Sequence, residues 1–415
     1  MRIAMLSYHT CPLATLGGKD TGGMNVYVRD LTRELGRHGV GVDVFTRSQD
    51  EHVPHVLHDL GYGNRIVHIP AGPEIPVEKS ELVDYVTTFV ENIQDFAATK
   101  LLRYDLLHAH YWLSGLAGLE LRDRWGIPLI QMFHTLALMK NRVARAESES
   151  EPDARVESER RLLREADRVV AATQAELAQI QWLYQTSTDR VVVIPPGVDT
   201  ARFYPIAKDE AREFISMPND NCMILFVGRI EALKGIDTLI KAMATLQEEG
   251  FLEKHPACVA IIGGEADLSD ERLSAEMARL QTMRLDAGLD DIVHFLGKRD
   301  QDTLQYYYSS AEIVVVPSHY ESFGLVALEA MACGTPVVAS ETGGLAFLVR
   351  DGETGYHVPT GNHVALAERI KELLTDEVLR VRMGNNAAAY ARQYDWSTIT
   401  DQMLELYGAL VPKLA

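Results

Sequence analysis

The chain contains 415 residues, 47% hydrophobic and 24% charged, which is ordinary globular composition and too long for one hydrophobic core. Acidic residues outnumber basic ones by 59 to 40, and the formal net charge of −19 repels nucleic acids and anionic membranes, so we expect neither as a partner. No apolar run reaches 18 residues, and Met1–Leu6 is too short for a signal sequence, which predicts a cytoplasmic protein.

Short β-branched runs alternate with amphipathic stretches along the chain, which predicts an α/β fold of βαβ units with parallel sheets. In the first half the expected strands are residues 3–6, 42–46, 66–69, 106–109, 129–133, 169–172 and 191–194. The alternation of β-branched and amphipathic stretches begins again after Pro195-Pro196-Gly197, which interrupts the first series. The second series of expected strands is residues 223–227, 259–262, 293–296, 313–316, 336–339 and 356–358.

Two such series of strands predict two domains, and two domains imply a cleft between them. We assign residues 1–200 to an N-terminal domain and residues 201–392 to a C-terminal domain. Residues 393–415 form a third segment, in which residues 396–411 have the apolar spacing of a helix through Ile399, Met403, Leu406 and Leu410. We expect this helix to pack back toward the N-terminal domain. Residues 147–161 form a charged stretch that we expect to be helical and mobile.

A glycine-rich loop, residues 17–23, follows the first expected strand and precedes an amphipathic helix. Glycines there let backbone amides approach a phosphate or a sugar at a helix N-terminus, where the dipole favours anions. The loop is not a GxGxxG fingerprint, and no acid follows the second strand, so a nicotinamide cofactor is disfavoured. The alternative is a plain flexible loop.

Two motifs in the second half carry the chemistry. The strand at 223–227 runs into Gly228-Arg229, and Lys234-Gly235 follows five residues later, so two cations flank a turn and could clamp a diphosphate. Glu321 ends a loop after the strand at 313–316, whereas Glu329 lies in the next helix. Carboxylates accept hydrogen bonds from vicinal hydroxyls, which suits a ribose and a hexose. The alternative for all four residues is solvated surface.

These motifs, with Ala332-Cys333-Gly334-Thr335-Pro336 and Gly343-Gly344, resemble the family 4 retaining glycosyltransferases. The resemblance implies the GT-B fold, in which two Rossmann-like domains face a central cleft and the nucleotide sugar lies mainly on the second domain. It implies that Arg229 and Lys234 bind the diphosphate, that Glu329 binds the ribose and that Glu321 binds the hexose. The remaining implied donor contacts are Gly23, Gly324 and Leu325, with His134 against the hexose. The catalytic set is then Arg229, Lys234, Glu321 and His134.

Three stretches of the first half narrow the resemblance, namely residues 20–27, 108–115 and 134–141. They are similar to the inositol-phosphate N-acetylglucosaminyltransferases of mycothiol synthesis and to the bacterial sucrose-phosphate synthases, which both use phosphorylated acceptors. The implied acceptor contacts are Asn25, Lys79, Tyr111, Thr135 and Arg155, the last four around the phosphate. The alternatives are a solvated helix start for Lys79, a core aromatic for Tyr111 and an exposed acidic helix for Arg155.

We therefore expect a retaining hexosyltransferase that uses a nucleotide diphosphate sugar, with UDP-glucose favoured. Fructose 6-phosphate, which gives sucrose 6-phosphate, is narrowly favoured as acceptor over inositol phosphate with a UDP-N-acetylglucosamine donor. No carboxylate pair of the hydrolase kind is evident, so a front-face mechanism is expected. A sugar-nucleotide epimerase would carry GxGxxG and Tyr-x-x-x-Lys, and a catalytically silent sugar-nucleotide sensor would lose the acceptor cations.

The sequence gives little indication of a metal site or of functional cysteines. His108, His110 and His134 lack HExxH spacing, so no metal site is expected and no cofactor is required, with Mg²⁺ left open. Cys11, Cys222, Cys258 and Cys333 are scattered and are expected as reduced thiols. The expected partners are the nucleotide sugar and the sugar or polyol phosphate, and the oligomeric state, including a homodimer, is left open.

Overall fold

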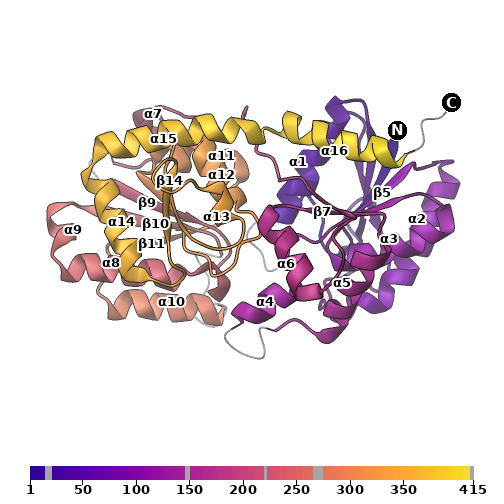
Figure 1. Ribbon diagram of the computed structural model, residues 1–415, viewed down its shortest axis with the longest axis horizontal. Coiled ribbons are helices and arrows are strands. Elements are labelled where there is room, and N and C mark those ends of the chain that lie inside the picture. The colour runs from indigo at the N-terminus through magenta and orange to yellow at the C-terminus, as the bar shows by residue number, and fades with distance from the viewer. Residues whose placement is uncertain (15–20, 145–149, 219–221, 265–273, 412–415) are drawn as a thin grey trace. The chain divides into compact units, whose positions relative to one another are not determined.

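The computed structural model describes residues 1–14, 21–144, 150–218, 222–264 and 274–411. Its contacts divide the chain into two compact units. The main part of unit 1 is Met1–Ala14, Gly23–Gly197 and the C-terminal helix that begins at Trp396, and the main part of unit 2 is Val198–Asp395. Both units alternate strands with helices, which is the α/β pattern of the sequence (Figure 1).

Unit 1 is built on an eight-stranded sheet with the order β3-β4-β2-β1-β5-β6-β7-β8, in which every pair is parallel except β3 with β4. The strands are β1 (Arg2–Leu6), β2 (Gly41–Arg47), β3 (Val56–Leu57), β4 (Arg65–Ile69), β5 (Leu106–His110), β6 (Leu129–Met132), β7 (Arg168–Ala171) and β8 (Val191–Val193). The seven strands expected from the sequence are confirmed. The two-residue edge strand β3 was missed, because two residues carry no detectable alternation.

The helices of unit 1 include the long helix α1, which follows the glycine-rich loop as expected. They are α1 (Gly23–Arg37), η1 (Leu82–Tyr85), α2 (Val86–Thr99), α3 (Trp112–Trp125), α4 (Ala137–Val143), α5 (Asp153–Glu165), α6 (Gln174–Tyr184) and α16 (Trp396–Leu410). Gly17–Asp20 of the glycine-rich loop lies outside the described residues. In α5, Arg155, Val156 and Glu159 are buried, so the expectation of a mobile charged helix is wrong for this part of it.

Unit 2 holds a six-stranded, fully parallel sheet with the order β11-β10-β9-β12-β13-β14. Its strands are β9 (Cys222–Val227), β10 (Ala257–Ile262), β11 (Val293–Gly297), β12 (Ile313–Val316), β13 (Val337–Ser340) and β14 (Gly355–Val358), so all six expected strands are confirmed. The helices are α7 (Lys208–Phe214), η3 (Ala232–Lys234), α8 (Ile236–Glu248), α9 (Phe251–Lys254), α10 (Ala275–Asp286), α11 (Gln301–Ser310), α12 (Leu325–Ala332), α13 (Leu345–Leu348), α14 (His363–Thr375), α15 (Glu377–Ala391) and η5 (Arg392–Tyr394).

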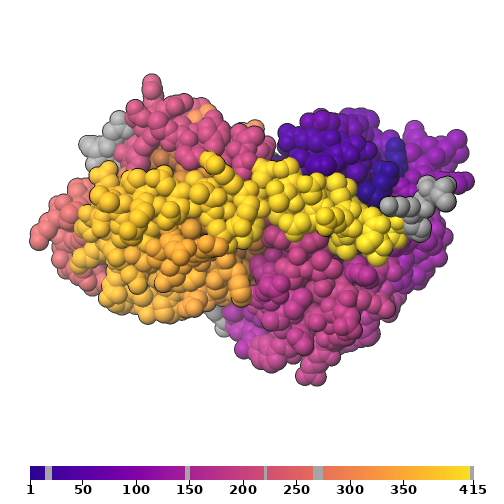
Figure 2. Space-filling view, turned by 45° about the horizontal axis from the view of Figure 1, so that its top comes forward, coloured from indigo at the N-terminus to yellow at the C-terminus, as the bar shows by residue number. Residues whose placement is uncertain are grey.

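The C-terminal helix α16 belongs to unit 1, where it contacts α1. Figure 2 shows this yellow helix lying against the indigo N-terminal part of the chain. The Trp396 ring packs edge-on against Tyr27 at 5.3 Å between centroids, and the Tyr407 hydroxyl lies 2.7 Å from Nδ1 of His108 in β5. Ile399, Met403 and Leu406 are buried as their spacing predicts, while Leu410 is half-buried. Among the described residues, no helix is long and apolar enough to span a membrane.

We predict that Tyr407→Phe destabilises unit 1 by about 1–3 kcal/mol, because it leaves a fully buried imidazole nitrogen of His108 without its partner. The matched control is Tyr27→Phe, since Tyr27 is equally buried and its hydroxyl has no hydrogen-bond partner among the described residues. The measurement is the denaturant midpoint of each variant, with hydrogen exchange in α16. Equal midpoints for the two variants would show that the Tyr407 hydrogen bond contributes nothing.

Candidate functional site

In unit 1, polar side chains gather where the sheet order reverses, next to β1 and β5. Parallel strands bind ligands at this switch point, beyond their carboxyl ends. His9 follows β1, Tyr111 follows β5, and His134 and Thr135 follow β6. Tyr111 and His134 have φ values of 75° and 62°, a left-handed backbone that non-glycine residues rarely adopt. Such strain is held by the surrounding structure and concentrates at functional sites.

Arg155 of α5 is the centre of this group, and its side chain is only 1% exposed. Its Nη1 donates to the Tyr111 hydroxyl at 3.0 Å, and its Nη2 donates to the carbonyl and the hydroxyl of Thr135 at 2.8 and 3.1 Å. Its Nε donates to Glu159 at 2.8 Å, and Nη1 also pairs with Glu151 at 2.9 Å. We call these five residues the Arg155 cluster. The alternative for Arg155, a charge in an exposed acidic helix, is therefore wrong.

Lys79 and His9 also lie close to Tyr111. Lys79 precedes η1 and its Nζ is 5.8 Å from the centre of the Tyr111 ring, while the Arg155 guanidinium is 4.7 Å from it. The His9 ring lies 4.5 Å from the same ring. Burial, with Lys79 and Arg155 nearby, holds the pKa of His9 well below its usual value, so His9 is neutral. Three of the four expected phosphate contacts touch directly, and the fourth borders them.

Asn25 in α1 is buried, and its amide nitrogen donates to the Thr10 hydroxyl at 2.9 Å and to the Cys11 carbonyl at 2.8 Å. These bonds hold the segment after β1 that carries His9. Gly23 is the first residue of α1. In this structure Asn25 therefore positions the backbone next to the Arg155 cluster.

The three histidines that the sequence singled out do come together. His110 Nδ1 lies 3.0 Å from His134 Nε2, and the His108 and His110 rings are 4.3 Å apart. Burial lowers the pKa of His108 and of His134 to about 3, so both are neutral near pH 7. Among the described residues, no three histidine, cysteine or acidic side chains are placed to hold a metal ion. The histidines pack as uncharged rings beneath Tyr27 and Tyr407.

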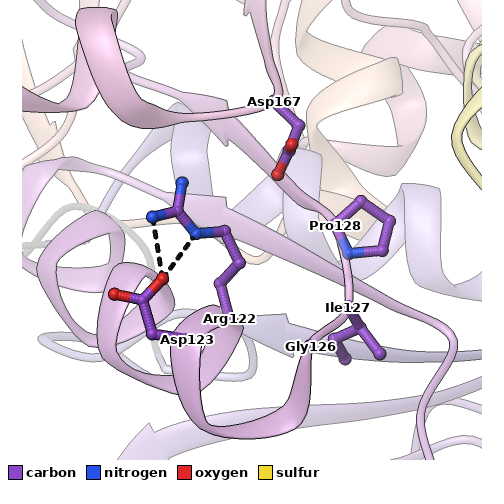
Figure 3. Close-up of a pocket in the computed structure, with 6 residues that line it drawn as sticks. All are labelled: Arg122, Asp123, Gly126, Ile127, Pro128 and Asp167. Atoms are coloured by element: carbon purple, nitrogen blue, oxygen red, sulfur yellow. Dashed lines mark hydrogen bonds and ion pairs between the residues drawn. The ribbon is translucent and has the colours of Figure 1, made fainter.

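A pocket of about 470 Å³ in unit 1 lies at the opposite edge of the sheet (Figure 3). It is lined by residues that precede β6 and β7, namely Arg122, Asp123, Gly126, Ile127, Pro128 and Asp167. Arg122 is paired with Asp123 at 2.8 Å, and Asp167 accepts the Leu129 amide at 2.8 Å. Its charged groups are thus already satisfied, and it lies at the amino ends of the strands rather than at the ligand-binding edge.

In unit 2 the sheet order reverses between β9 and β12, and the expected donor residues lie beyond the carboxyl ends of these two strands. Arg229 follows β9 and pairs with Glu231 at 2.7 Å. Lys234 ends η3, and its Nζ lies 2.6 Å from Glu321 in the loop after β12. The two cations therefore border one edge of this sheet, each already paired with a carboxylate.

Glycines allow this close approach. Gly235 has φ +68°, and a Cβ there would lie 2.0 Å from the Pro317 carbonyl oxygen. Gly343 has φ +50°, and a Cβ there would lie 1.9 Å from the Glu321 carbonyl oxygen, which also accepts the Gly344 amide at 2.9 Å. Glu321 is therefore held by its backbone as well as by Lys234.

Glu329 lies inside α12, one turn beyond Gly324 and Leu325, and is 7% exposed. The Tyr308 hydroxyl donates to one carboxylate oxygen at 2.7 Å, and Gln301 donates to the other at 3.4 Å. Burial and the neighbouring Glu329 raise the pKa of Tyr308 well above its usual value, so Tyr308 remains a donor. A buried carboxylate fixed by two donors can accept further hydrogen bonds from ligand hydroxyls.

Sequence reasoning missed five residues of these sites: His9, Glu151, Glu159, Gln301 and Tyr308. One of them left a signal, because Glu159 stands four residues after Arg155 on the same face of α5, whereas Glu151 stands four residues before Arg155 but outside that helix. In a stretch as acidic as this one, that spacing was indistinguishable from a solvated surface. His9, Gln301 and Tyr308 belong to no spaced motif, and only the fold brings them to the sites.

These features define a glycosyltransferase of the two-domain GT-B fold. A family model described as "Glycosyltransferase Family 4" matches residues 21–202, and one described as "Glycosyl transferases group 1" matches residues 207–390. The chain belongs to glycosyltransferase family 4. The resemblance seen in the motifs of both halves is thereby confirmed.

Several proteins are similar to this chain over nearly its whole length. The chain is 40% identical over 409 residues to a D-inositol 3-phosphate glycosyltransferase of Actinosynnema mirum, covering 98% of this chain and 97% of the relative. It is 39% identical over 407 residues to a protein of the same name from Saccharomonospora viridis, covering 98% and 93%. The solved structure of a sucrose-phosphate synthase from Thermosynechococcus elongatus is 35% identical, with a TM-score of 0.89 over 99% of each chain.

We predict that Gly343→Ala destabilises unit 2 by more than about 3 kcal/mol, because the left-handed backbone costs about 1 kcal/mol and the new Cβ collides with the Glu321 carbonyl. The control is Gly352→Ala, since Gly352 has φ +75° but no atom within 4 Å of its Cβ position. The measurement is thermal unfolding of both variants. If Gly343→Ala costs no more than Gly352→Ala, the loop is free to give way and Glu321 is not held as described.

Proposed function

We propose that this protein transfers a hexose from a UDP-sugar to inositol phosphate, with retention of configuration. The observation that carries the proposal is the Arg155 cluster with Lys79, where cations and hydroxyls suited to a phosphate meet at the ligand-binding edge of unit 1. The names of the relatives that are 38–40% identical favour inositol phosphate. The sequence had narrowly favoured fructose 6-phosphate, which becomes the second candidate, supported by the 35% identical sucrose-phosphate synthase.

On the donor side, we assign the diphosphate to Arg229 and Lys234, the ribose to Glu329 and the hexose to Glu321 and His134. Arg229 and Lys234 stabilise negative charge as the glycosidic bond to the diphosphate breaks. A front-face route, in which the leaving phosphate oxygen accepts the proton of the acceptor hydroxyl, requires no carboxylate nucleophile. Gly23, Gly324 and Leu325 contribute backbone at the starts of α1 and α12, where a helix N-terminus favours anions.

The direct test is a screen of UDP-glucose and UDP-N-acetylglucosamine against inositol phosphate, fructose 6-phosphate and the two free polyols. Product masses identify the transferred sugar, and the anomeric proton coupling of the product reports retention. Transfer to inositol phosphate supports the proposal. Transfer to fructose 6-phosphate alone establishes the second candidate, and donor binding without transfer to any acceptor would favour the sugar-nucleotide sensor.

We predict that Lys79→Ala raises the KM for the phosphorylated acceptor by roughly 10- to 100-fold, because a hydrogen bond to a charged group contributes about 1.5–3 kcal/mol. Donor KM should change little. The control is Lys100→Ala, which removes the same charge from the exposed end of α2 in unit 1. An unchanged acceptor KM in Lys79→Ala would return Lys79 to the solvated surface.

We predict that Glu329→Gln weakens UDP binding by about 1–3 kcal/mol, because a charge-assisted hydrogen bond to ribose becomes a neutral one. Glu368→Gln removes the same charge from an exposed position in α14 and should leave affinity unchanged. Calorimetry with UDP measures both variants. Equal affinity of wild type and Glu329→Gln would remove Glu329 from the ribose.

A further inference from the structure

The guanidinium of Arg155 has no donor to spare in this structure. Its five N–H groups face Glu159, the Tyr111 hydroxyl, Glu151, and the carbonyl and hydroxyl of Thr135. A phosphate that uses Arg155 must therefore displace one of these partners. The partner that is displaced from Arg155 determines which ligands the site can bind.

Four of the five contacts are poorly suited to leave. Glu159 is fully buried and also binds the Ala137 amide and the Tyr184 hydroxyl, so its displacement would strand an uncompensated buried carboxylate. The hydroxyls of Tyr111 and Thr135 are neutral and can themselves donate to a phosphate, so they need not be displaced, and the Thr135 carbonyl is neutral backbone. Glu151 differs, because among the described residues it is the one charged partner of Arg155 that reaches solvent, with 16% of its side chain exposed.

Glu151 also resembles a bound anion in what it contacts. Its two carboxylate oxygens engage two cations, with Oε2 at 2.9 Å from Arg155 and Oε1 bonded to Lys140. Burial acts to raise the pKa of Glu151, but Arg155 and Lys140 outweigh it and hold that pKa below its usual value. The backbone of Glu151 is held by Asn141, whose Oδ1 accepts the Glu151 amide at 2.6 Å. The residue is thus an ionised carboxylate placed between two cations.

We propose that Glu151 is an internal counter-anion that occupies the phosphate subsite of the acceptor and must be displaced when a phosphorylated acceptor binds. Displacement exchanges one anion for another of greater charge, so Arg155 and Lys140 remain neutralised throughout. A neutral acceptor cannot make this exchange, since it would take from Arg155 and Lys140 the carboxylate that they share and supply no negative charge in its place. Glu151 is therefore a specificity-determining residue that selects acceptors carrying a dianionic group.

This inference rests on the proposed function for the identity of the subsite, yet it can be tested without transfer. Inorganic phosphate is the probe, and calorimetry on the full chain measures its affinity. Glu151→Gln should bind phosphate about tenfold more tightly than wild type, because apparent affinity rises with the fraction of molecules in which the subsite is open. Glu157→Gln is the matched control, since it removes the same charge six residues further along, in α5, at a side chain that is 71% exposed. It should change phosphate affinity little.

The kinetic readout separates this role from a structural one. Glu151→Gln should lower the KM for the phosphorylated acceptor about tenfold with little change in kcat, whereas a variant with damaged folding would lose kcat. Weaker phosphate binding in Glu151→Gln, or equal effects of Glu151→Gln and Glu157→Gln, would overturn the inference. If phosphate binds Glu151→Gln more tightly but no phosphorylated acceptor is used, the inference stands and the proposed function fails.

Discussion

The desolvation of the Arg155 guanidinium is the constraint on which the ligand-binding edge of unit 1 depends. Removing a cation from water costs several kcal/mol unless its hydrogen bonds and charge are satisfied. Here the satisfying groups come from three separate places in the chain, the start of α3, the loop after β6 and the helix α5 with the residues just before it. Because all of these groups hydrogen-bond to one planar guanidinium, Arg155 fixes the relative position of the segments that carry them. Tyr111, one of these converging residues, has a left-handed backbone with a φ of 75°.

A second regularity follows from the charge of the chain. Because the net charge is −19, the cations that the proposed function assigns to phosphates lie among many carboxylates that attract them. Three cations of the two candidate sites are paired this way: Arg155 with Glu151, Arg229 with Glu231, and Lys234 with Glu321. Local pairing avoids unbalanced buried charge before a ligand arrives. Ligand binding then becomes an exchange of anions, which favours a phosphate over a weaker acceptor of hydrogen bonds.

The sequence predicted the sheets well and the sites incompletely, for physical reasons. Strands such as residues 313–316 are continuous β-branched runs, a signal that survives without any knowledge of contacts. Arg229, Lys234, Glu321 and Glu329 could be singled out because they follow strands or flank glycines at a recognisable spacing. Arg155 was ambiguous, since a buried arginine and a solvated one look alike in an acidic helix. Glu151 and Tyr308 gain their importance from partners distant in sequence, and such partners leave no local pattern.

A phosphate site alone does not discriminate between the two candidate acceptors. In the proposed function, the Arg155 cluster with Lys79 binds the phosphate by charge and hydrogen bonding, and inositol phosphate and fructose 6-phosphate both carry such a phosphate. Discrimination between them must come from groups that meet the polyol hydroxyls. The neutral His9 ring against Tyr111, and the segment after β1 that Asn25 holds in place, are uncharged groups that border the cluster. Because a site built to hydrogen-bond a hydroxyl strongly rejects an analogue that lacks it, the choice of acceptor depends on these uncharged neighbours rather than on the cations.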